Sequence, residues 1–357
     1  MLHLVLLMIS LYSLLYKTVR FFIKYTVFLF QWAKFKHQDL EDVVIAGHKL
    51  LDILNKNKLL LVPNIKISSH LKREIYDLEF SNPLTFSSYE SNLTLLSYFL
   101  KLGIAGGCYK TMMPQPRSGN LRPRLQELVV ADNRCLINAM GLPGPGARKA
   151  INDLLSSSLL TFNRPIGLSL GGESPEEYYE TFSIYNNAIL NTNFPFYYEL
   201  NISCPNTEKG KDLTNNIVLL ENLIEKIREN TLRTISVKVS PDQTNDQISL
   251  IAEMLTRFDK IMINAGNTQF KSMTDVGLKR SSIAIGGGGL SGEYLFSRTC
   301  EMIDLLSPFK IPIIATGGIS NTKNVRVCLE KGASLVGMAS ALAFNPYIIS
   351  KILKELK

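Results

Sequence analysis

Histidine and paired cysteine are scarce in this chain, which excludes several kinds of chemistry. All four histidines lie before residue 71, so the later part of the chain has no imidazole to act as a base or a metal ligand. The five cysteines are Cys108, Cys135, Cys204, Cys300 and Cys328. Their odd number and the absence of Cys-x-x-Cys spacing argue against a metal site and a disulfide framework, and favour a reducing, cytosolic compartment.

The positive charge of the chain lacks the pattern of a nucleic-acid-binding protein. The formal net charge is +8, but the basic residues are scattered and no nucleic-acid module is present, so we expect no nucleic-acid partner. Anionic lipid, phosphate or an acidic substrate explains the charge equally well. With 46% hydrophobic and 20% charged residues, the chain suits one α/β barrel with an extension better than two unrelated domains.

The N-terminal region is apolar and then basic. Residues 1–16 carry no charged side chain and reach about half to three-quarters of the length of a membrane-spanning helix. Lys17, Arg20, Lys24 and Lys34 follow at intervals close to helical turns, with aromatic residues on other faces. We expect residues 1–36 to bind the cytoplasmic side of an anionic membrane, as a peripheral or N-terminally anchored segment. The alternatives are a signal peptide, disfavoured because the charge follows the apolar run, and an ordinary pair of core helices.

After a helical connector at residues 37–77, strand-like and helix-like runs alternate. Strands are expected at residues 103–109, 165–170, 196–200, 234–239, 260–263, 311–315 and 334–337. Helices are expected at residues 175–190, 216–230, 245–258, 294–306, 322–331 and 346–356. The alternation predicts an α/β fold, a (β/α)8 TIM barrel over residues 78–357 with an N-terminal helical extension. Residues 114–138 interrupt the pattern and are expected to form a hairpin that covers the barrel mouth.

Polar residues and glycines mark the carboxyl ends of the predicted strands. They are Lys110, Ser169, Asn201 to Asn206, Lys238, Asn264, Gly317, Gly318, Ala339 and Ser340. A parallel barrel brings all of these ends to one face, where barrel enzymes have their active sites, so the pattern predicts a site there. Taken alone, the asparagines could be turn or cap residues, the lysines solvated charges, and Cys204 a small buried hydrophobe.

Two motifs indicate what this site binds. Residues 201–207, Asn-Ile-Ser-Cys-Pro-Asn-Thr, place a thiol between two carboxamides, which can hold a flat, amide-rich ring while the sulfur removes a proton from it. The glycine pair in residues 313–319 and the helix start in residues 336–340, with Gly-rich residues 288–292 upstream, supply backbone donors for a phosphate.

These motifs, in this order, resemble those of the dihydroorotate dehydrogenases, FMN enzymes of pyrimidine synthesis. The resemblance covers roughly residues 80–345 and includes Asn82-Pro-Leu84, residues 114–120, Pro123-Arg124, residues 137–142, the Cys204 loop, residues 237–239 and residues 263–264. It implies FMN as cofactor, dihydroorotate and orotate as substrate and product, and Cys204 as the catalytic base.

The resemblance also assigns roles to individual residues. Those implied to bind the substrate are Lys110, Asn138, Met140, Gly141, Leu142, Asn201, Asn206 and Asn264. Those implied to bind the flavin are Lys110, Thr111, Ser169, Asn201, Lys238, Ile263, Ser291, Gly292, Gly317, Gly318, Ala339 and Ser340. Among these, Lys238 matches the lysine beside the flavin ring, where its positive charge stabilises negative charge.

The family divides by base and electron acceptor, and this chain combines features of both branches. Cys204 and Lys110-Thr111 resemble the soluble branch, which reduces fumarate or a partner subunit, whereas the N-terminal segment and residues 114–117 resemble the membrane-bound branch, which reduces quinone. We therefore expect quinone as the acceptor, with fumarate as the alternative. The sequence leaves a homodimer open.

Three departures from the family leave two alternatives open. Phe86-Ser87-Ser88 belongs to a stretch where the family usually has Ala-Ala-Gly, Ala265 replaces the usual Ser or Thr, and the lysine typical of the quinone branch is absent. One alternative is a flavin oxidoreductase acting on another pyrimidine, although dihydropyrimidine dehydrogenases usually carry His at the Asn206 position. The other alternative is a catalytically silent, membrane-tethered barrel.

Overall fold

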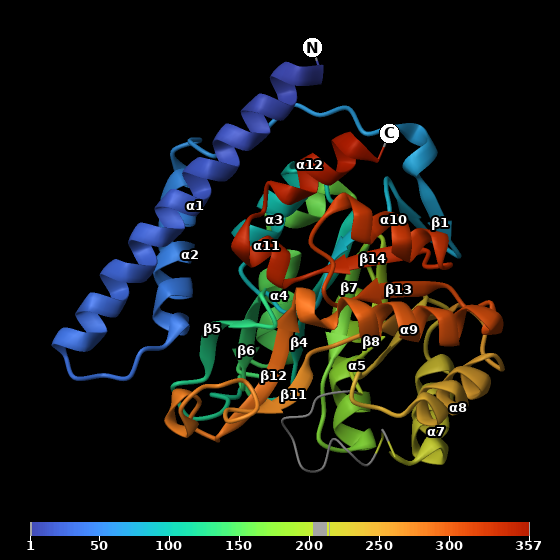
Figure 1. Cartoon of the computed structure of the whole chain (residues 1–357). Coiled ribbons are helices and arrows are strands. Elements are labelled where there is room, and N and C mark those ends of the chain that lie inside the picture. Colours follow the sequence, from blue (N-terminus) through green and yellow to red (C-terminus); the bar gives the residue numbers. More distant parts are fainter. Residues whose placement is uncertain (1, 203–212, 214, 357) are drawn as a thin grey trace.

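Eight parallel strands form a closed barrel. The computed structural model describes residues 2–202, 213 and 215–356 (Figure 1). Around the barrel the order is β10-β13-β14-β3-β4-β7-β8-β9. The bounds are β3 Leu84–Phe86, β4 Gly106–Met112, β7 Ile166–Leu170, β8 Phe196–Leu200, β9 Ile235–Val239, β10 Ile261–Ala265, β13 Ile313–Thr316 and β14 Leu335–Met338. The predicted (β/α)8 barrel is confirmed.

Helices connect these strands on the outside of the barrel. They are α3 Leu93–Lys101, α4 Ala147–Leu155, α5 Pro175–Ile189, α7 Ile217–Arg228, α8 Asn245–Leu255, α9 Phe296–Leu306, α10 Thr322–Glu330, α11 Ser340–Phe344 and α12 Ile348–Glu355. The expected helices all appear with slightly different ends, whereas β3, α3 and α4 were not expected. Three residues of β3 are too few to show a strand pattern, although they close the barrel between β14 and β4.

Side chains alternate between the outside and the inside of each strand. In β8, Phe196, Tyr198 and Leu200 belong to the main core between strands and helices, and the Tyr198 ring lies 4.9 Å from that of Phe182 in α5. Burying each such side chain contributes roughly 1.5 to 3 kcal/mol. Tyr197 points inward, into a cluster with residues of the short hairpin formed by β1 (Arg73–Ile75) and β2 (Leu78–Phe80), which packs against the amino ends of the strands.

A second, four-stranded sheet lies beside the carboxyl ends of the barrel strands. Its order is β11 (Gln269–Ser272), β12 (Gly287–Gly292), β6 (Asn133–Asn138) and β5 (Leu125–Val130) (Figure 1). Strands β5 and β6 form the hairpin expected within residues 114–138, joined by Ala131 and Asp132, which both have positive φ (46° and 61°). Positive φ at both central residues is typical of the turns that fit the twist of a hairpin.

The N-terminal extension consists of two helices, α1 (Leu2–Ala33) and α2 (Leu40–Lys56), which lie along one side of the barrel (Figure 1). The 32 residues of α1 form one continuous helix, not two segments. One stripe of α1 packs against protein: Ile9 is buried, and Tyr12 and Tyr16 pack against Tyr347 just before α12.

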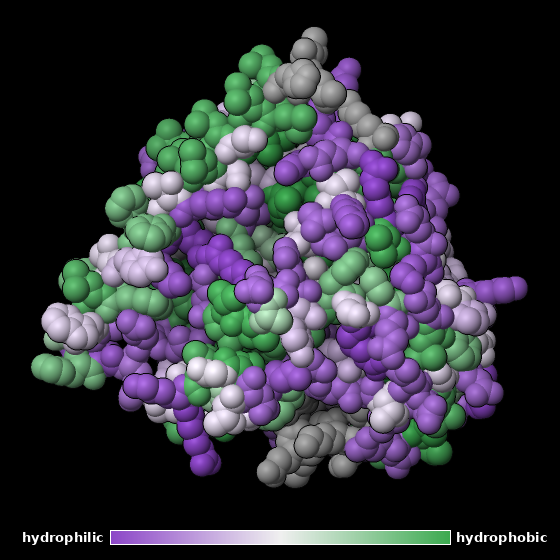
Figure 2. Space-filling model, viewed as in Figure 1, coloured by the Kyte–Doolittle hydropathy of each residue, from purple (hydrophilic) through white to green (hydrophobic). Residues whose placement is uncertain are grey.

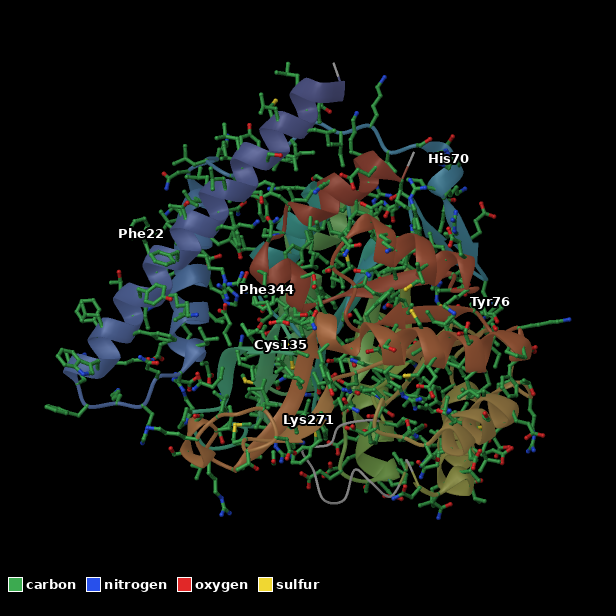
Figure 3. All side chains as sticks on the ribbon, in the orientation of Figure 1. Phe22, His70, Tyr76, Cys135, Lys271 and Phe344 are labelled. Carbon is green, nitrogen blue, oxygen red and sulfur yellow. The ribbon has the colours of Figure 1, made fainter. Side chains whose placement is uncertain are left out.

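The opposite face of α1 is apolar and exposed. Its exposed side chains include Leu7, Leu11, Leu14 and Phe22. Figure 2 shows hydrophobic side chains gathered along this helix, and Figure 3 labels Phe22 on it. By length and composition, residues Leu4–Ala33 could cross a membrane, and only 6% of the most apolar stretch is buried.

The basic residues of α1 and of the turn after it, Lys17, Arg20, Lys24 and Lys34, are expected to face an anionic membrane. This prediction is wrong for Arg20 and Lys24. Arg20 and Lys24 face the protein and pair with Glu127 of β5 at 2.8 and 3.2 Å. The guanidinium of Arg20 also lies over the ring of Phe344 in α11, 5.3 Å from its centroid. These two cations therefore dock α1 onto the second sheet and α11.

Candidate active site

A buried polar network fills the inside of the barrel near the carboxyl ends of its strands. At its centre is Glu199 of β8, which is fully buried. Its carboxylate accepts hydrogen bonds from the Ser88 hydroxyl (2.7 Å), the Asn264 amide (2.7 Å) and the Ser169 hydroxyl (3.3 Å). The sequence prediction missed Glu199, although a single acidic residue in the strand Phe-Tyr-Tyr-Glu-Leu was a signal, because a buried carboxylate requires partners.

The network continues through predicted site residues. The Thr111 and Ser169 hydroxyls lie 2.8 Å apart, and the Asn201 amide donates to Thr111 Oγ1 at 2.8 Å. Lys238 of β9 donates from Nζ to Ser88 Oγ at 3.2 Å. The structure thus brings together Thr111, Ser169, Asn201, Lys238 and Asn264. Each lies in the last part of its strand or directly after it.

Lys110 lies in β4 near the same end of the barrel, next to the loop that follows β3. Its backbone N–H donates to the carbonyl of Glu90 at 3.1 Å. Burial lowers the pKa of the Lys110 ammonium, and the nearby Glu90 carboxylate opposes that shift. Glu90 also pairs with His48 of α2 at 3.2 Å, and although burial opposes it, this partner raises the pKa of His48. The N-terminal extension is therefore in direct contact with a residue beside Lys110.

The glycine-rich segments form sharp turns close to one another. Gly317 and Gly318 have φ of 125° and 71°, which side-chain-bearing residues rarely adopt. A Cβ atom on Gly318 would lie 2.4 Å from the backbone nitrogen of Phe296, at the start of α9. Thr299 of α9 donates to the Gly317 carbonyl at 2.9 Å. Gly292, just before α9, has φ of 130°.

The remaining predicted residues lie in three places. Asn138 and Ser291 are on the paired strands β6 and β12; the Asn138 amide donates to the Gly289 carbonyl at 3.4 Å, and Ser291 to that of Leu136 at 3.3 Å. Met140, Gly141 and Leu142 follow β6, and Ala339 and Ser340 begin α11. The side chain of Ile263 points outward into the main core and not into the barrel. Cys204 and Asn206 lie outside the described residues.

Hydrogen-bonding groups without partners mark where a polar ligand fits. Among the described residues, Ser87 Oγ, Asn264 Oδ1 and Thr316 Oγ1 are buried and have no hydrogen-bond partner. All three residues line one narrow interior cavity, together with Glu199 and Gly337. Buried polar atoms are rarely left unpaired, so these three atoms mark a place near the strand ends where polar partners are missing.

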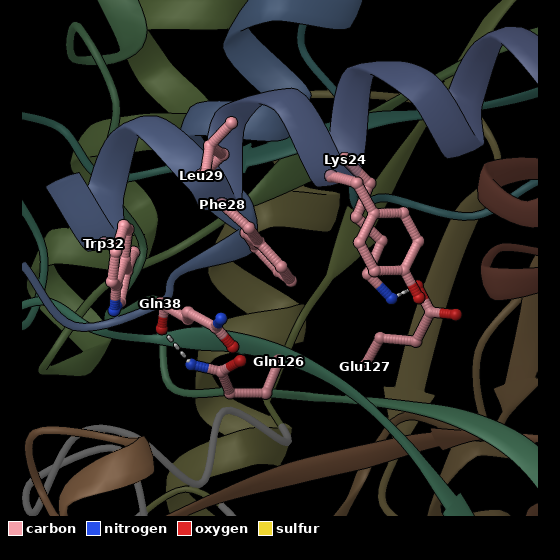
Figure 4. A pocket seen from close by; sticks show the side chains of 8 residues that line it. Lys24, Phe28, Leu29, Trp32, Gln38, Gln126 and Glu127 are labelled. Carbon is pink, nitrogen blue, oxygen red and sulfur yellow. Dashed lines mark hydrogen bonds and ion pairs between the residues drawn. The ribbon is translucent and has the colours of Figure 1, made fainter.

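A separate groove of about 510 Å³ lies between α1 and β5 (Figure 4). Tyr25, Phe28, Leu29 and Trp32 of α1 form its apolar wall. Gln126 and Glu127 of β5 line the other side, and the ion pair between Glu127 and Lys24 of α1 connects the two sides. Its apolar wall continues into the exposed face of α1, so the groove combines an apolar side with a polar one.

The fold and this site define an α/β-barrel protein whose polar groups and cation converge on the carboxyl ends of the strands. A family model described as dihydroorotate dehydrogenase matches residues 70–357. The chain belongs to the dihydroorotate dehydrogenase family, as its motifs indicated, and members of this family generally depend on a flavin.

Individual relatives agree with this assignment. A protein of Nitrosomonas europaea named dihydroorotate dehydrogenase (quinone) is 28% identical over 333 residues, which cover 89% of this chain and 94% of the relative. A protein of the same name from Christiangramia forsetii is 29% identical, covering 81% and 85%. The fold is similar to that in a crystal structure of DHODH in complex with ferulenol from Eimeria tenella, with a TM-score of 0.69, 18% identity and coverage of 87% and 89%.

Proposed function

We propose that this protein oxidises dihydroorotate to orotate in pyrimidine synthesis, with FMN as its cofactor and a membrane quinone as the electron acceptor. The observation that supports this best is the buried set of Asn201, Asn264 and Lys238 at the strand ends, in a chain of the dihydroorotate dehydrogenase family. Amides match the ring of a dihydropyrimidine, which carries N–H donors and carbonyl acceptors in one plane.

The substrate is held by amides, a lysine and a loop. Lys110 binds the substrate carboxylate, and Asn138, Asn201, Asn206 and Asn264 bind the ring, with Met140 to Leu142 covering it. Cys204 removes the proton from C5 of dihydroorotate. This role is supported by the Asn-x-x-Cys-x-Asn motif, which places a thiol between two carboxamides in a part of the chain that has no histidine.

FMN, when bound, would supply an acceptor for the hydride that leaves C6 of dihydroorotate. Lys238 would place a fixed positive charge beside its ring, and Thr111, Ser169 and the unpaired hydroxyls of Ser87 and Thr316 would supply polar partners. Backbone groups of Ser291-Gly292, Gly317-Gly318 and Ala339-Ser340 hold the phosphate, which needs no arginine because successive backbone N–H groups attract an anion.

The N-terminal extension binds the cytoplasmic side of a membrane, from which the quinone acceptor reaches the protein. Because Ile9, Tyr16, Arg20 and Lys24 contact protein on one stripe of α1, only the opposite apolar face is available to lipid. Such a helix lies on the membrane instead of crossing it. The groove beside it suits a quinone, which has an apolar tail and a polar ring. The names of the relatives favour quinone over fumarate.

Flavin absorbance tests the function directly. The purified protein should be yellow and should bleach when dihydroorotate is added without oxygen, and a quinone should restore the colour faster than fumarate or NAD. Bleaching by a different dihydropyrimidine only would favour the alternative substrate. A colourless protein that neither binds FMN nor responds to dihydroorotate would support the silent barrel and refute the proposal.

A further inference from the structure

The carboxylate of Glu199 restricts how its neighbours are oriented. A carboxylate has only acceptor atoms, so each group that contacts it must donate a hydrogen. Asn264 therefore turns its Nδ2 toward Glu199, at 2.7 Å from Oε2. If the amide were reversed, its oxygen atom would face a carboxylate oxygen atom at this distance.

Because Nδ2 is occupied by Glu199, the other end of the Asn264 amide is fixed as well. Oδ1 is buried and has no partner among the described residues, and Asn264 lines the interior cavity. We infer that Glu199 is a positioning residue, which orients Asn264 so that Oδ1 accepts a ring N–H of the substrate. This inference rests on the proposed function, because orotate supplies that N–H.

Ser88 connects this carboxylate to the positive charge of the site. It donates to Glu199 at 2.7 Å and accepts from Lys238 Nζ at 3.2 Å. The Ser88 hydroxyl thus links the ammonium of Lys238 to the carboxylate that contacts Asn264. Ser88 belongs to the stretch in which this chain departs from the family, so the departure provides the link between the two charges.

Glu199→Gln tests the inference with almost no change in shape. Glutamine can both donate and accept, so it no longer forces Asn264 into one orientation. We expect the variant to retain its flavin and to bind orotate about tenfold more weakly in a spectral titration. Wild-type protein should also reject orotate methylated on one ring nitrogen, and this discrimination should shrink in the variant. Ser236→Ala is the matched control, because Ser236 is a fully buried residue in register with Glu199 on β9.

A double-mutant cycle separates positioning from a general structural role. If Glu199 acts through Asn264, Glu199→Gln should weaken orotate binding by less than about twofold when Asn264 is already alanine. The inference would be overturned if the two substitutions weakened orotate binding by independent factors that multiply in the double variant. It would also be overturned if Glu199→Gln bound orotate, and rejected methylated orotate, as the wild-type protein does. Both outcomes would leave the proposed function intact. If wild-type protein does not bind orotate, both fail.

A second measurement is made on the wild-type protein and does not require Glu199→Gln to fold. In protein labelled with 15N-asparagine, the Asn264 side-chain amide is identified by its loss in Asn264→Ala. Its protons should be protected from exchange with solvent before orotate is added, because they face a buried carboxylate. Rapid exchange in the ligand-free protein would contradict the assigned orientation.

Discussion

Glu127 is expected to hold helix α1 on the barrel, and its replacement by glutamine should loosen that helix. Its carboxylate contacts Arg20, Lys24 and Arg134 at 2.8, 3.2 and 2.6 Å. Although burial alone would raise it, these cations, Arg20 foremost, lower the pKa of Glu127 from 4.5 to about 2. At 1.36 kcal/mol per pH unit, such a change is equivalent to about 3 kcal/mol.

Solvent reduces this figure. The side chains of Arg20 and Lys24 are each 17% exposed and that of Arg134 is 46% exposed, so water screens part of the attraction. Roughly 1 to 2 kcal/mol should remain for docking of α1, which equals about a 5- to 30-fold change in its opening equilibrium. Hydrogen exchange in peptides from residues 17–33 should accelerate by that factor in Glu127→Gln.

The pH dependence follows from the lowered pKa. The stabilisation is fully present above pH 4.5 and is lost as pH falls toward 2, because a native carboxylate with a low pKa must then be protonated. The ratio of the exchange rates of Glu127→Gln and wild type in these peptides should therefore fall between pH 7 and pH 3. Its logarithm should shrink by more than half. Glu79→Gln is the control, since Glu79 pairs with Lys72 at 2.9 Å but is 67% exposed. Equal acceleration of α1 in both variants, or none in Glu127→Gln, would refute the reasoning.

Three further predictions concern the proposed reaction. Cys204→Ala should keep FMN but reduce the rate of flavin bleaching by dihydroorotate about a hundred- to ten-thousand-fold, whereas Cys204→Ser keeps a measurable fraction; an alanine variant with the wild-type stopped-flow rate would exclude Cys204 as the base. Lys238→Ala should slow bleaching and weaken FMN binding, and Lys110→Ala should weaken orotate binding; normal titrations and rates in both would misplace the site. Deleting residues 1–36 should leave reduction of a soluble dye intact, release the protein from anionic liposomes and depress quinone turnover; continued sedimentation with vesicles would show that the anchor lies elsewhere.

The barrel could be predicted from sequence because its signal is local. Apolar strands such as β8 and amphipathic helices such as α5 carry their periodicity within one short segment. Strand β3 has only three residues, and its membership of the barrel depends on pairing with β14 and β4, far away in sequence. Local patterns do not contain such pairing.

The site was only partly predictable for the same reason. Asn264 and Lys238 stand at strand ends, which a strand pattern locates. The role of Glu199 depends on contacts with Ser88 and Asn264, which are 111 and 65 residues away in sequence. Likewise, Arg20 and Lys24 look like a membrane-facing stripe until Glu127, about a hundred residues later, is placed beside them.

The departures from the family near residue 88 have a structural explanation in this chain. Ser88 bridges Lys238 and Glu199, and Glu90 pairs with His48 of α2. Tyr89 is largely buried and packs against the same core cluster as Tyr16 of α1. Side chains larger than the usual Ala-Ala-Gly thus fasten the N-terminal helices to the strand ends. The stretch that suggested a silent barrel therefore has a structural role, because it connects the N-terminal helices with the polar network at the strand ends.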